Sequence, residues 1–387
     1  MLTQPTGAGH PDQTGASDLG LLRSVLREFC DEQIPSPHPR PPSDDLDHTL
    51  WRRIAQELEL TGFSVPTEYG GAGFSWGDQA VVFEELGRSL TSLPYFASVA
   101  LATTALLATP DDNAKARYLP GLADGSRVGA LATADDSQDR GVRAWSVEQR
   151  FRLGGRKLFA LDAQYADLLL VSAKVSGSGA LFAVEASAPG VLVEPMNSLD
   201  LTRGVAQVTM TNVAAELIGE VGGAPDYLRR ARDLANGALA AEQVGGIERC
   251  LEMSVAYAAE RHQFGRAIGS FQAIKHKCVD MLVQLELARS LALDACSSAA
   301  SGPETLSLAA SSACAFATTA YQAAAAETIQ IHGGIGFTWE HEAHLHYRRA
   351  ATNASLHTSA RQLRETIADS CCTNPALRPN SADPVTQ

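Results

Sequence analysis

The residues with the clearest potential for chemistry lie in two segments of the last third of the chain. The first segment covers residues 256–281 and reads AYAAERHQFGRAIGSFQAIKHKCVDM. The second covers residues 330–350 and reads QIHGGIGFTWEHEAHLHYRRA. Together they supply a planar cation, aromatic rings, amide side chains and a pair of glycines, which are groups that can bind a dinucleotide.

In the first segment, Arg261 carries a fixed planar charge that can donate two parallel hydrogen bonds to a pyrophosphate. Phe264 and Phe271 can line an adenine or flavin ring, and Gln272 can hydrogen-bond to its edge. Each residue alone has a simpler explanation, because an arginine that ends a helix more often interacts with the helix dipole.

The second segment adds Gly333 and Gly334, which remove side chains where a backbone would have to approach a phosphate or a ring closely. A glycine pair after a helix is more often a simple C-terminal cap. Only the ordered combination of both segments favours a dinucleotide site over these simpler explanations.

Composition and the other motifs exclude several functions. The formal net charge of -13 makes nucleic-acid binding unfavourable. The seven cysteines form no CxxC pair, so we expect reduced thiols in a cytoplasmic protein and no metal site. No GxGxxG follows a strand, and no GxSxG, HExxH or Walker pattern is present. The N-terminus lacks the pattern of a secretory signal, and no run predicts a membrane span.

The periodicity of apolar residues predicts an α+β multidomain fold with three parts. Helical spacing dominates residues 19–125, short strands rich in Val, Leu and Phe occupy 126–222, and helical spacing returns over 223–370. We expect an N-terminal helical domain, a middle antiparallel β-barrel-like domain and a C-terminal helical bundle. The polar ends, 1–18 and 371–387, are expected to be disordered.

Three segments in this order resemble the acyl-CoA dehydrogenases: residues 62–90, 256–281 and 330–350. The likeness covers most of the chain from Leu19 to Ala368 and is weakest in the β module. It implies a C-terminal four-helix bundle, an FAD cofactor, an acyl-CoA substrate, a dimer or tetramer, and electron-transferring flavoprotein as the electron acceptor. The resemblance points to these cofactor-binding residues, which in the family come from adjacent subunits around one FAD: Arg261, Gln263, Phe264, Phe271, Gln272, Gln330, Gly333 and Gly334.

The family reaction needs a carboxylate base, and neither of its two usual positions carries one here. The matching positions lie near His357 and near Ala235. The candidates that remain are Glu242, which is two helical turns beyond Ala235, and His357 itself, since a histidine titrates near neutral pH. Glu242 is more simply read as a polar contact between helices, and Asp233 would reach the site only with a shifted alignment.

The β module departs from the family as well. Thr133 is the remnant of a usual flavin-binding loop, Phe159 stands in for a tryptophan, and Leu161 takes the place of a hydroxyl residue. The chain therefore resembles the base-less subunit of heteromeric bacterial acyl-CoA dehydrogenases, examples of which act on sterol side-chain thioesters. Two alternatives stay open: a family-like flavin monooxygenase or other oxidase, which would need no carboxylate base, and a non-catalytic structural subunit.

Overall fold

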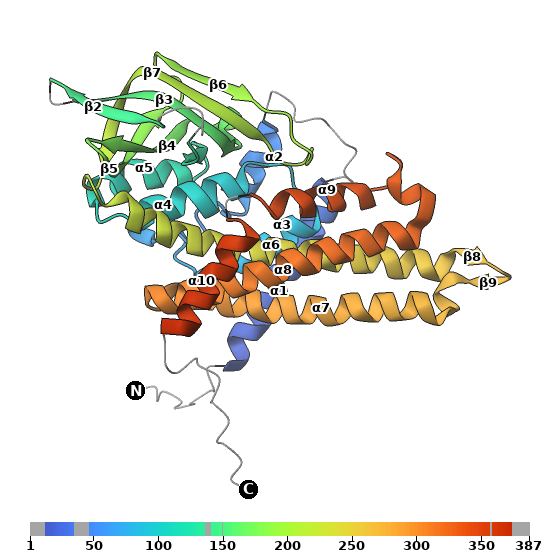
Figure 1. Cartoon of the computed structure of the whole chain (residues 1–387). Helices are drawn as coiled ribbons and strands as arrows, with labels where there is room; N and C mark the ends of the chain where they lie inside the picture. Colours follow the sequence, from blue (N-terminus) through green and yellow to red (C-terminus); the bar gives the residue numbers. More distant parts are fainter. Residues whose placement is uncertain (1–11, 35–45, 136–140, 149, 357, 374–387) are drawn as a thin grey trace, which may run out of the picture.

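A computed structural model of the chain describes residues 12–34, 46–135, 141–148, 150–356 and 358–373. Figure 1 shows a β domain lying against one side of the helices, with three long helices of the C-terminal part running alongside one another below it. The predicted order of helices, β domain and helices is confirmed.

The N-terminal part is helical, as its apolar spacing predicts. Helix α3 begins with a capping box in which Ser75 and Asp78 exchange hydrogen bonds, so its first backbone N–H groups are satisfied. The elements of this part are α1 (Asp12–Gln33), α2 (His48–Arg52), the π-helix η1 (Arg53–Glu57), the 3-10 helix η2 (Thr67–Tyr69), α3 (Trp76–Arg88), the π-helix η3 (Phe96–Thr103), α4 (Thr104–Leu107) and α5 (Asp112–Ala123).

The first and last helices extend into the ranges predicted for the two tails. Helix α1 begins at Asp12, inside the range 1–18 that was expected to be disordered. The last helix ends at Thr373, so Cys371 and Cys372 belong to its final turn and not to a tail. A helix that continues beyond its apolar residues, at either end, gains one hydrogen bond for each added residue. No proline interrupts either of these two stretches.

The middle part folds into a seven-stranded sheet whose strands β4, β2, β3, β7 and β5 close into a ring through the β4–β5 pairing. The predicted barrel-like domain is thus confirmed. Most pairings are antiparallel, but β1 and β2 both run parallel to β4. The strands are β1 (Gly129–Ala132), β2 (Arg143–Val147), β3 (Arg150–Leu161), β4 (Leu168–Val175), β5 (Ser178–Glu185), β6 (Val191–Pro195) and β7 (Val205–Ile218), with the 3-10 helix η4 (Ala163–Tyr165) after β3.

The C-terminal part is a bundle built on α6 (Ala224–Glu260), α7 (Gln272–Ser297) and α8 (Pro303–His332), with α10 (Ala360–Thr373) packed against α8. A short hairpin, β8 (His262–Gln263) and β9 (Arg266–Ala267), joins α6 to α7 at one end of the bundle. The remaining elements are the 3-10 helices η5 (Ile268–Ser270), η6 (Ser298–Ala300) and η7 (Gly333–Phe337), and helix α9 (Ala343–Asn353).

Glycines let α3 cross α6 at unusually close range. A Cβ at Gly87 of α3 would lie 2.1 Å from the carbonyl oxygen of Glu242, and a Cβ at Gly245 of α6 would lie 1.8 Å from that of Glu84. Neither site has room for a side chain, so the two backbones meet directly. This crossing holds helix α3 directly against α6 of the bundle.

Candidate functional site

The first group of predicted cofactor-binding residues lies at the hairpin end of the bundle. Helix α6 ends at Glu260, and Arg261 follows it in an extended conformation. The turn of the hairpin holds Phe264 and Gly265, both with positive φ, and the side chain of Phe264 is 92% exposed. Its ring lies edge-on to Phe271, with centroids 6.2 Å apart. The exposed ring of Phe264 is therefore accessible to a ligand.

The glycine pair lies at the end of α8. Gly333 has φ +63 and ends the helix, and added Cβ atoms at Gly333 and Gly334 would meet nothing within 4 Å. Gln330, one turn before, is also exposed. The backbone of this turn is therefore open to a ligand from outside the chain.

The structure brings these two groups to the same end of the bundle (Figure 1). Tyr257, one turn before Arg261, stacks on His332, the residue before Gly333, with ring centroids 4.4 Å apart. This end thus presents the cation, the aromatic rings and the open glycine turn side by side. Gln263 in β8 and Gln272 at the start of α7 are exposed at the same place.

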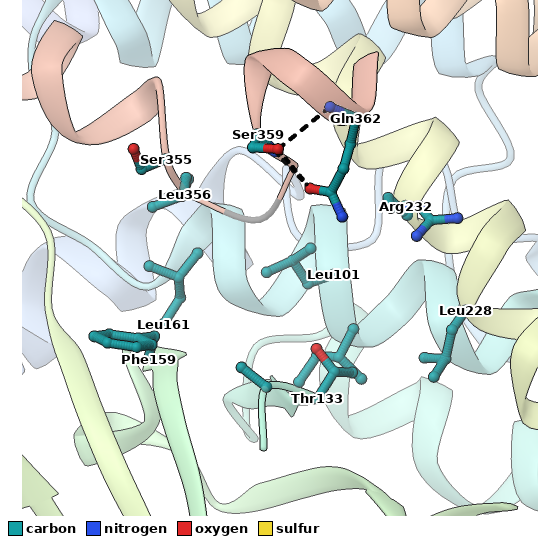
Figure 2. Close-up of a pocket in the computed structure, with 12 residues that line it drawn as sticks. Leu101, Thr133, Phe159, Leu161, Leu228, Arg232, Ser355, Leu356, Ser359 and Gln362 are labelled. Atoms are coloured by element: carbon teal, nitrogen blue, oxygen red, sulfur yellow. Dashed lines mark hydrogen bonds between the residues drawn. The ribbon is translucent and has the colours of Figure 1, made fainter. Parts of the chain in front are cut away.

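A second candidate region lies far from this end, where the β domain meets α6 and α10. A hollow of about 430 Å³ opens there, with Phe159 and Leu161 on one side and Leu228 and Arg232 on the other (Figure 2). A neighbouring hollow of about 540 Å³ shares Phe159, Leu161, Ser355 and Leu356 with it. These are the β3 positions at which the sequence indicated a departure from the family.

Phe159 lines both hollows and has an unusual backbone conformation. It has φ +55, its side chain is 60% exposed, and the β3–β7 register is interrupted between Lys157 and Ala160. A positive φ is uncommon for a large residue other than glycine. It directs the side chain differently from a residue in a regular extended strand. The strand expected to lie beside a flavin is thus bulged at this point.

The two candidate regions are too far apart in one chain to hold one dinucleotide between them. Arg232, which lines the first hollow, and Arg261 lie at opposite ends of a continuous α6. At 1.5 Å per residue their Cα atoms are separated by roughly 40 Å. A dinucleotide that contacted Arg232 of one chain could therefore reach an Arg261 only from a second chain.

Neither hollow offers a carboxylate among the described residues that line it. His357 lies outside the described residues, and its neighbours Ser355 and Leu356 line both hollows. Ala235 is fully buried in α6. Burial raises the pKa of Asp233, which is hydrogen-bonded to Ser307 of α8 and does not line either hollow.

Glu242, the other candidate base, is held in a buried ion-pair cluster. Arg203 Nη2 donates to Glu242 Oε1 at 2.6 Å, and Arg349 Nη1 donates to the same oxygen at 3.0 Å. Burial alone would raise the pKa of Glu242, but the attraction of both arginines outweighs it and the pKa lies below its usual value. A carboxylate with a lowered pKa and two arginine partners is a poor proton acceptor.

Asp162 belongs to the same buried region and titrates differently. Its Oδ1 accepts a hydrogen bond from the Gly204 N–H at 2.8 Å, and burial raises its pKa to about 7 against the attraction of Arg203 and Arg349. An unfolded aspartate titrates near 3.9, so between about pH 4 and 7 the unfolded chain has released a proton that the folded chain keeps. The contribution of Asp162 to the free energy of unfolding should therefore fall as the pH rises through this window.

Replacing Asp162 with asparagine should remove this dependence. Asparagine also tolerates the left-handed conformation that Asp162 adopts, at φ +48. We expect the stability of Asp162→Asn relative to the wild type to rise by roughly 1.4 kcal/mol per pH unit between pH 4 and 7. Urea unfolding at several pH values measures this slope, and the exposed substitution Asp226→Asn serves as the control. Parallel pH profiles for wild type and Asp162→Asn would show that the carboxyl stays ionised.

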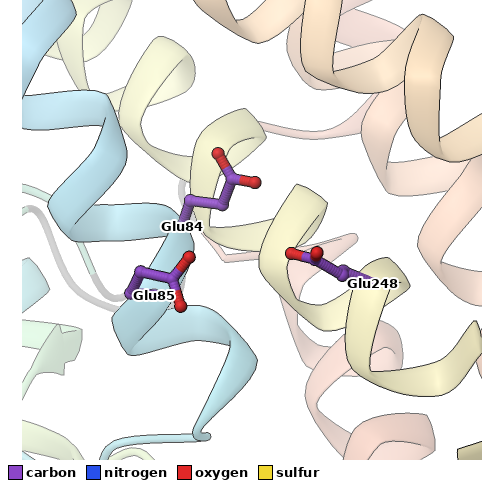
Figure 3. A group of neighbouring side chains, drawn as sticks. All are labelled: Glu84, Glu85 and Glu248. Atoms are coloured by element: carbon purple, nitrogen blue, oxygen red, sulfur yellow. The ribbon is translucent and has the colours of Figure 1, made fainter. Parts of the chain in front are cut away.

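One cluster of carboxylates has the spacing of a metal site. Among the described residues, ligand atoms of Glu84, Glu85 and Glu248 lie within 4.8 Å of one another (Figure 3). Arginines surround all three. Arg27 Nη2 lies 2.8 Å from Glu85 and 3.0 Å from Glu248, and Arg289 Nη2 lies 2.8 Å from Glu84.

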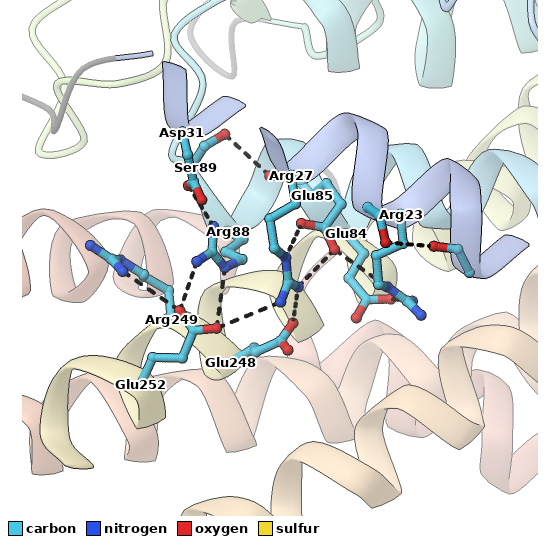
Figure 4. Close-up of polar contacts among 12 residues, drawn as sticks. Arg23, Arg27, Asp31, Glu84, Glu85, Arg88, Ser89, Glu248, Arg249 and Glu252 are labelled. Carbon is cyan, nitrogen blue, oxygen red and sulfur yellow. Dashed lines mark hydrogen bonds and ion pairs between the residues drawn. The ribbon is translucent and has the colours of Figure 1, made fainter. Parts of the chain in front are cut away.

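Figure 4 shows the same carboxylates within an arginine network that joins α1, α3 and α6. Arginine charges already neutralise the carboxylates, so the cluster forms ion pairs that hold the helices together.

Replacing Arg27 with methionine should lower the free energy of unfolding by about 2 kcal/mol, because Glu85 would lose its bidentate partner in a mostly buried setting. Urea unfolding measures the loss, and Arg361→Met, which removes an exposed i,i+4 pair, should cost less than about 0.5 kcal/mol. Equal losses for Arg27→Met and Arg361→Met would contradict the view that the cluster holds the helices together.

Comparison with known proteins decides the family. The sequence profile of the acyl-CoA dehydrogenase N-terminal domain matches residues 17–126, and that of the C-terminal domain matches residues 228–371. The acyl-CoA dehydrogenase IpdE2 of Mycobacterium tuberculosis is 35% identical over 318 residues, which cover 82% of this chain and 85% of that protein. The chain belongs to the acyl-CoA dehydrogenase family. Members of this family are oxidoreductases that act on CH–CH groups.

Solved structures of the family share this fold. The Tcur3481–Tcur3483 steroid acyl-CoA dehydrogenase variant matches with a TM-score of 0.80 and 27% identity, over 92% of this chain and 98% of that one. The ChsE4–ChsE5 complex of Mycobacterium tuberculosis matches with a TM-score of 0.82 and 25% identity, over 96% and 100%. In the described part of the chain, no helix is long and apolar enough to cross a membrane.

Sequence reasoning missed several residues around the hollows. Arg232 follows Leu228 by one helical turn, so the two share a face of α6, and this spacing could have placed both together. The sequence did not predict that Gln362 lines the hollow, because its position depends on the turn between α9 and α10. The partners of Glu242, Arg203 and Arg349, were missed because residues that meet only through tertiary packing leave no local pattern.

Proposed function

We propose that this chain is a subunit of an FAD-dependent acyl-CoA dehydrogenase and that another subunit supplies the catalytic base. The observation that carries the proposal is the contrast between the two candidate regions. The hairpin end keeps the residues that suit a dinucleotide, whereas no described residue lining the hollows offers a carboxylate.

In this proposal the residues at the hairpin end hold FAD that also contacts a second subunit. Arg261 donates to the pyrophosphate, Phe264 and Phe271 cover a ring, and Gln263, Gln272 and Gln330 hydrogen-bond to its edges. The open turn at Gly333 and Gly334 lets the backbone approach closely. When bound, FAD supplies the acceptor for the hydride that leaves the β carbon of an acyl-CoA thioester.

The α proton of the thioester needs a base, and we propose that it comes from the partner subunit. Two relatives in fold, the ChsE4–ChsE5 complex and the Tcur3481–Tcur3483 steroid acyl-CoA dehydrogenase, are each named for two different chains, which supports a heteromeric assembly. The likeness to IpdE2 and to a steroid acyl-CoA dehydrogenase supports a lipid or steroid thioester as substrate. Electron-transferring flavoprotein is the proposed electron acceptor, and the cytoplasm is the proposed location.

Co-expression with a candidate partner, an acyl-CoA dehydrogenase subunit that carries the catalytic carboxylate, tests the assembly. We expect the two chains to copurify in equal amounts as a yellow complex that oxidises an acyl-CoA, and we expect the lone chain to be colourless or inactive. Visible absorption and the subunit ratio give the readout. A lone chain that purifies with full FAD loading and turns over an acyl-CoA would rule out the heteromeric proposal.

A further inference from the structure

The hollow between the β domain and α6 has an apolar body and one cationic side. Half of the residues that line it are leucines or phenylalanine: Leu101, Leu131, Phe159, Leu161, Leu228 and Leu356. Thr133, Ser355 and Ser359 add hydroxyl groups to its wall. Arg232 of α6 lines the side opposite Phe159 (Figure 2). The side chain of Arg232 is exposed, so its charge is accessible to a ligand that enters the hollow.

The charge of Arg232 has no partner that belongs to the hollow. Among the described residues, no carboxylate lines this cavity, and no hydrogen bond or ion pair holds the guanidinium. The adjacent Asp233 is attracted by the charge of Arg232, but its carboxyl is hydrogen-bonded to Ser307 of α8 and does not line the hollow. Arg230, two residues earlier, does have a partner, because it donates to the carbonyl of Ala299 at 3.0 Å.

Gln362 of α10 adds a second polar group to the same side. Its Oε1 accepts hydrogen bonds from the N–H and the hydroxyl of Ser359, at 2.9 and 2.8 Å. These two bonds fix the orientation of the amide, so its nitrogen is left as a donor toward the cavity that Gln362 and Arg232 both line (Figure 2). A cation and an oriented N–H donor on one side of a largely apolar cavity can bind an anionic oxygen group.

We propose that Arg232 and Gln362 bind an anionic oxygen group of the thioester ligand while the leucines hold its hydrocarbon part. The inference rests on the proposed function, since it takes the ligand to be an acyl-CoA. Such a ligand can bring the anion from two sources, a carboxylate on the acyl group or a phosphate of the CoA moiety. Recognition of a carboxylate would make the substrate class an acyl-CoA with a second acidic group.

Binding of matched thioesters to the FAD-loaded complex tests this, with Arg232→Met and Arg232→Lys as variants. Arg229→Met is the matched control, because Arg229 lies on the same helix but lines a different hollow. Isothermal titration compares adipoyl-CoA with hexanoyl-CoA, and S-adipoyl-N-acetylcysteamine with S-hexanoyl-N-acetylcysteamine. S-hexanoyl-N-acetylcysteamine carries neither a carboxylate nor a phosphate.

If an acyl carboxylate is the anion, Arg232→Met should weaken both adipoyl probes about tenfold and leave both hexanoyl probes unchanged, since a charge-assisted hydrogen bond is lost. If a CoA phosphate is the anion, both CoA thioesters should weaken and both N-acetylcysteamine thioesters should not. Arg232→Lys should recover part of the affinity in either case.

Unchanged affinity for all four probes, or an equal loss for all four, would overturn the proposal. Failure of the wild-type complex to bind any of the thioesters would contradict the proposed function as well. The two failures are distinguishable because the first leaves thioester binding intact.

Discussion

Replacing Arg349 with methionine should lower the free energy of unfolding by about 4 kcal/mol, the cost of removing one partner from a buried ion pair. The Arg349 side chain is almost fully buried on α9, where it contacts Glu242 of α6 at 3.0 Å and Asp200 of the β domain at 2.7 Å. The substitution would leave both carboxylates with too little positive charge around them. Urea unfolding measures the loss.

The neighbouring Arg348 provides the control for this substitution. It donates to the carbonyl of Leu199 at 3.3 Å and lies over the ring of Trp339, without a carboxylate partner in the described part of the chain. Arg348→Met should therefore cost less than about 1 kcal/mol. A similar loss for both arginines would show that the cluster around Glu242 does not fasten the β domain to the bundle.

Replacing Arg261 with methionine should weaken FAD binding about 100-fold without lowering stability. The guanidinium is exposed and makes no ion pair with the described residues, so its loss costs the fold little. A bidentate, charge-assisted contact to a pyrophosphate is worth about 3 kcal/mol, which corresponds to roughly two decades in affinity. Flavin fluorescence during titration of the apo-complex gives the dissociation constant.

Arg261→Lys should fall between the wild type and Arg261→Met, since a lysine keeps the charge but not the planar fork. Arg229→Met, near the other end of α6, should bind FAD with unchanged affinity. If Arg261→Met retained wild-type affinity, the hairpin end would not be the pyrophosphate site.

The sequence predicted the architecture well because each part has its own periodicity. Three-to-four spacing over α6, α7 and α8 and short β-rich runs between 126 and 222 each signal one kind of element. The register and direction of the strands in the β domain could not be predicted from the sequence. The parallel pairings of β1 and β2 with β4 depend on how the barrel closes, and no local pattern in these strands encodes it.

The candidate site was predictable only where it is contiguous in sequence. Arg261 with Phe264, and Gly333 with Gly334, lie in single segments, and the structure places both at one end of the bundle. The hollow was not predictable, since Phe159 and Arg232 meet only after the β domain packs against α6. For the same reason the sequence could not show that Glu242 is enclosed by arginines.

Anaerobic mixing of an acyl-CoA with the FAD-loaded protein tests most directly whether this chain lacks a catalytic base. When the substrate reduces the flavin, the visible absorption band of oxidised flavin is lost. Stopped-flow spectroscopy records the rate of this loss. We expect the lone chain, reconstituted with FAD, to show no bleaching by acyl-CoA, whereas the complex with its base-bearing partner bleaches fully. Rapid and complete bleaching of the lone chain would contradict the proposal.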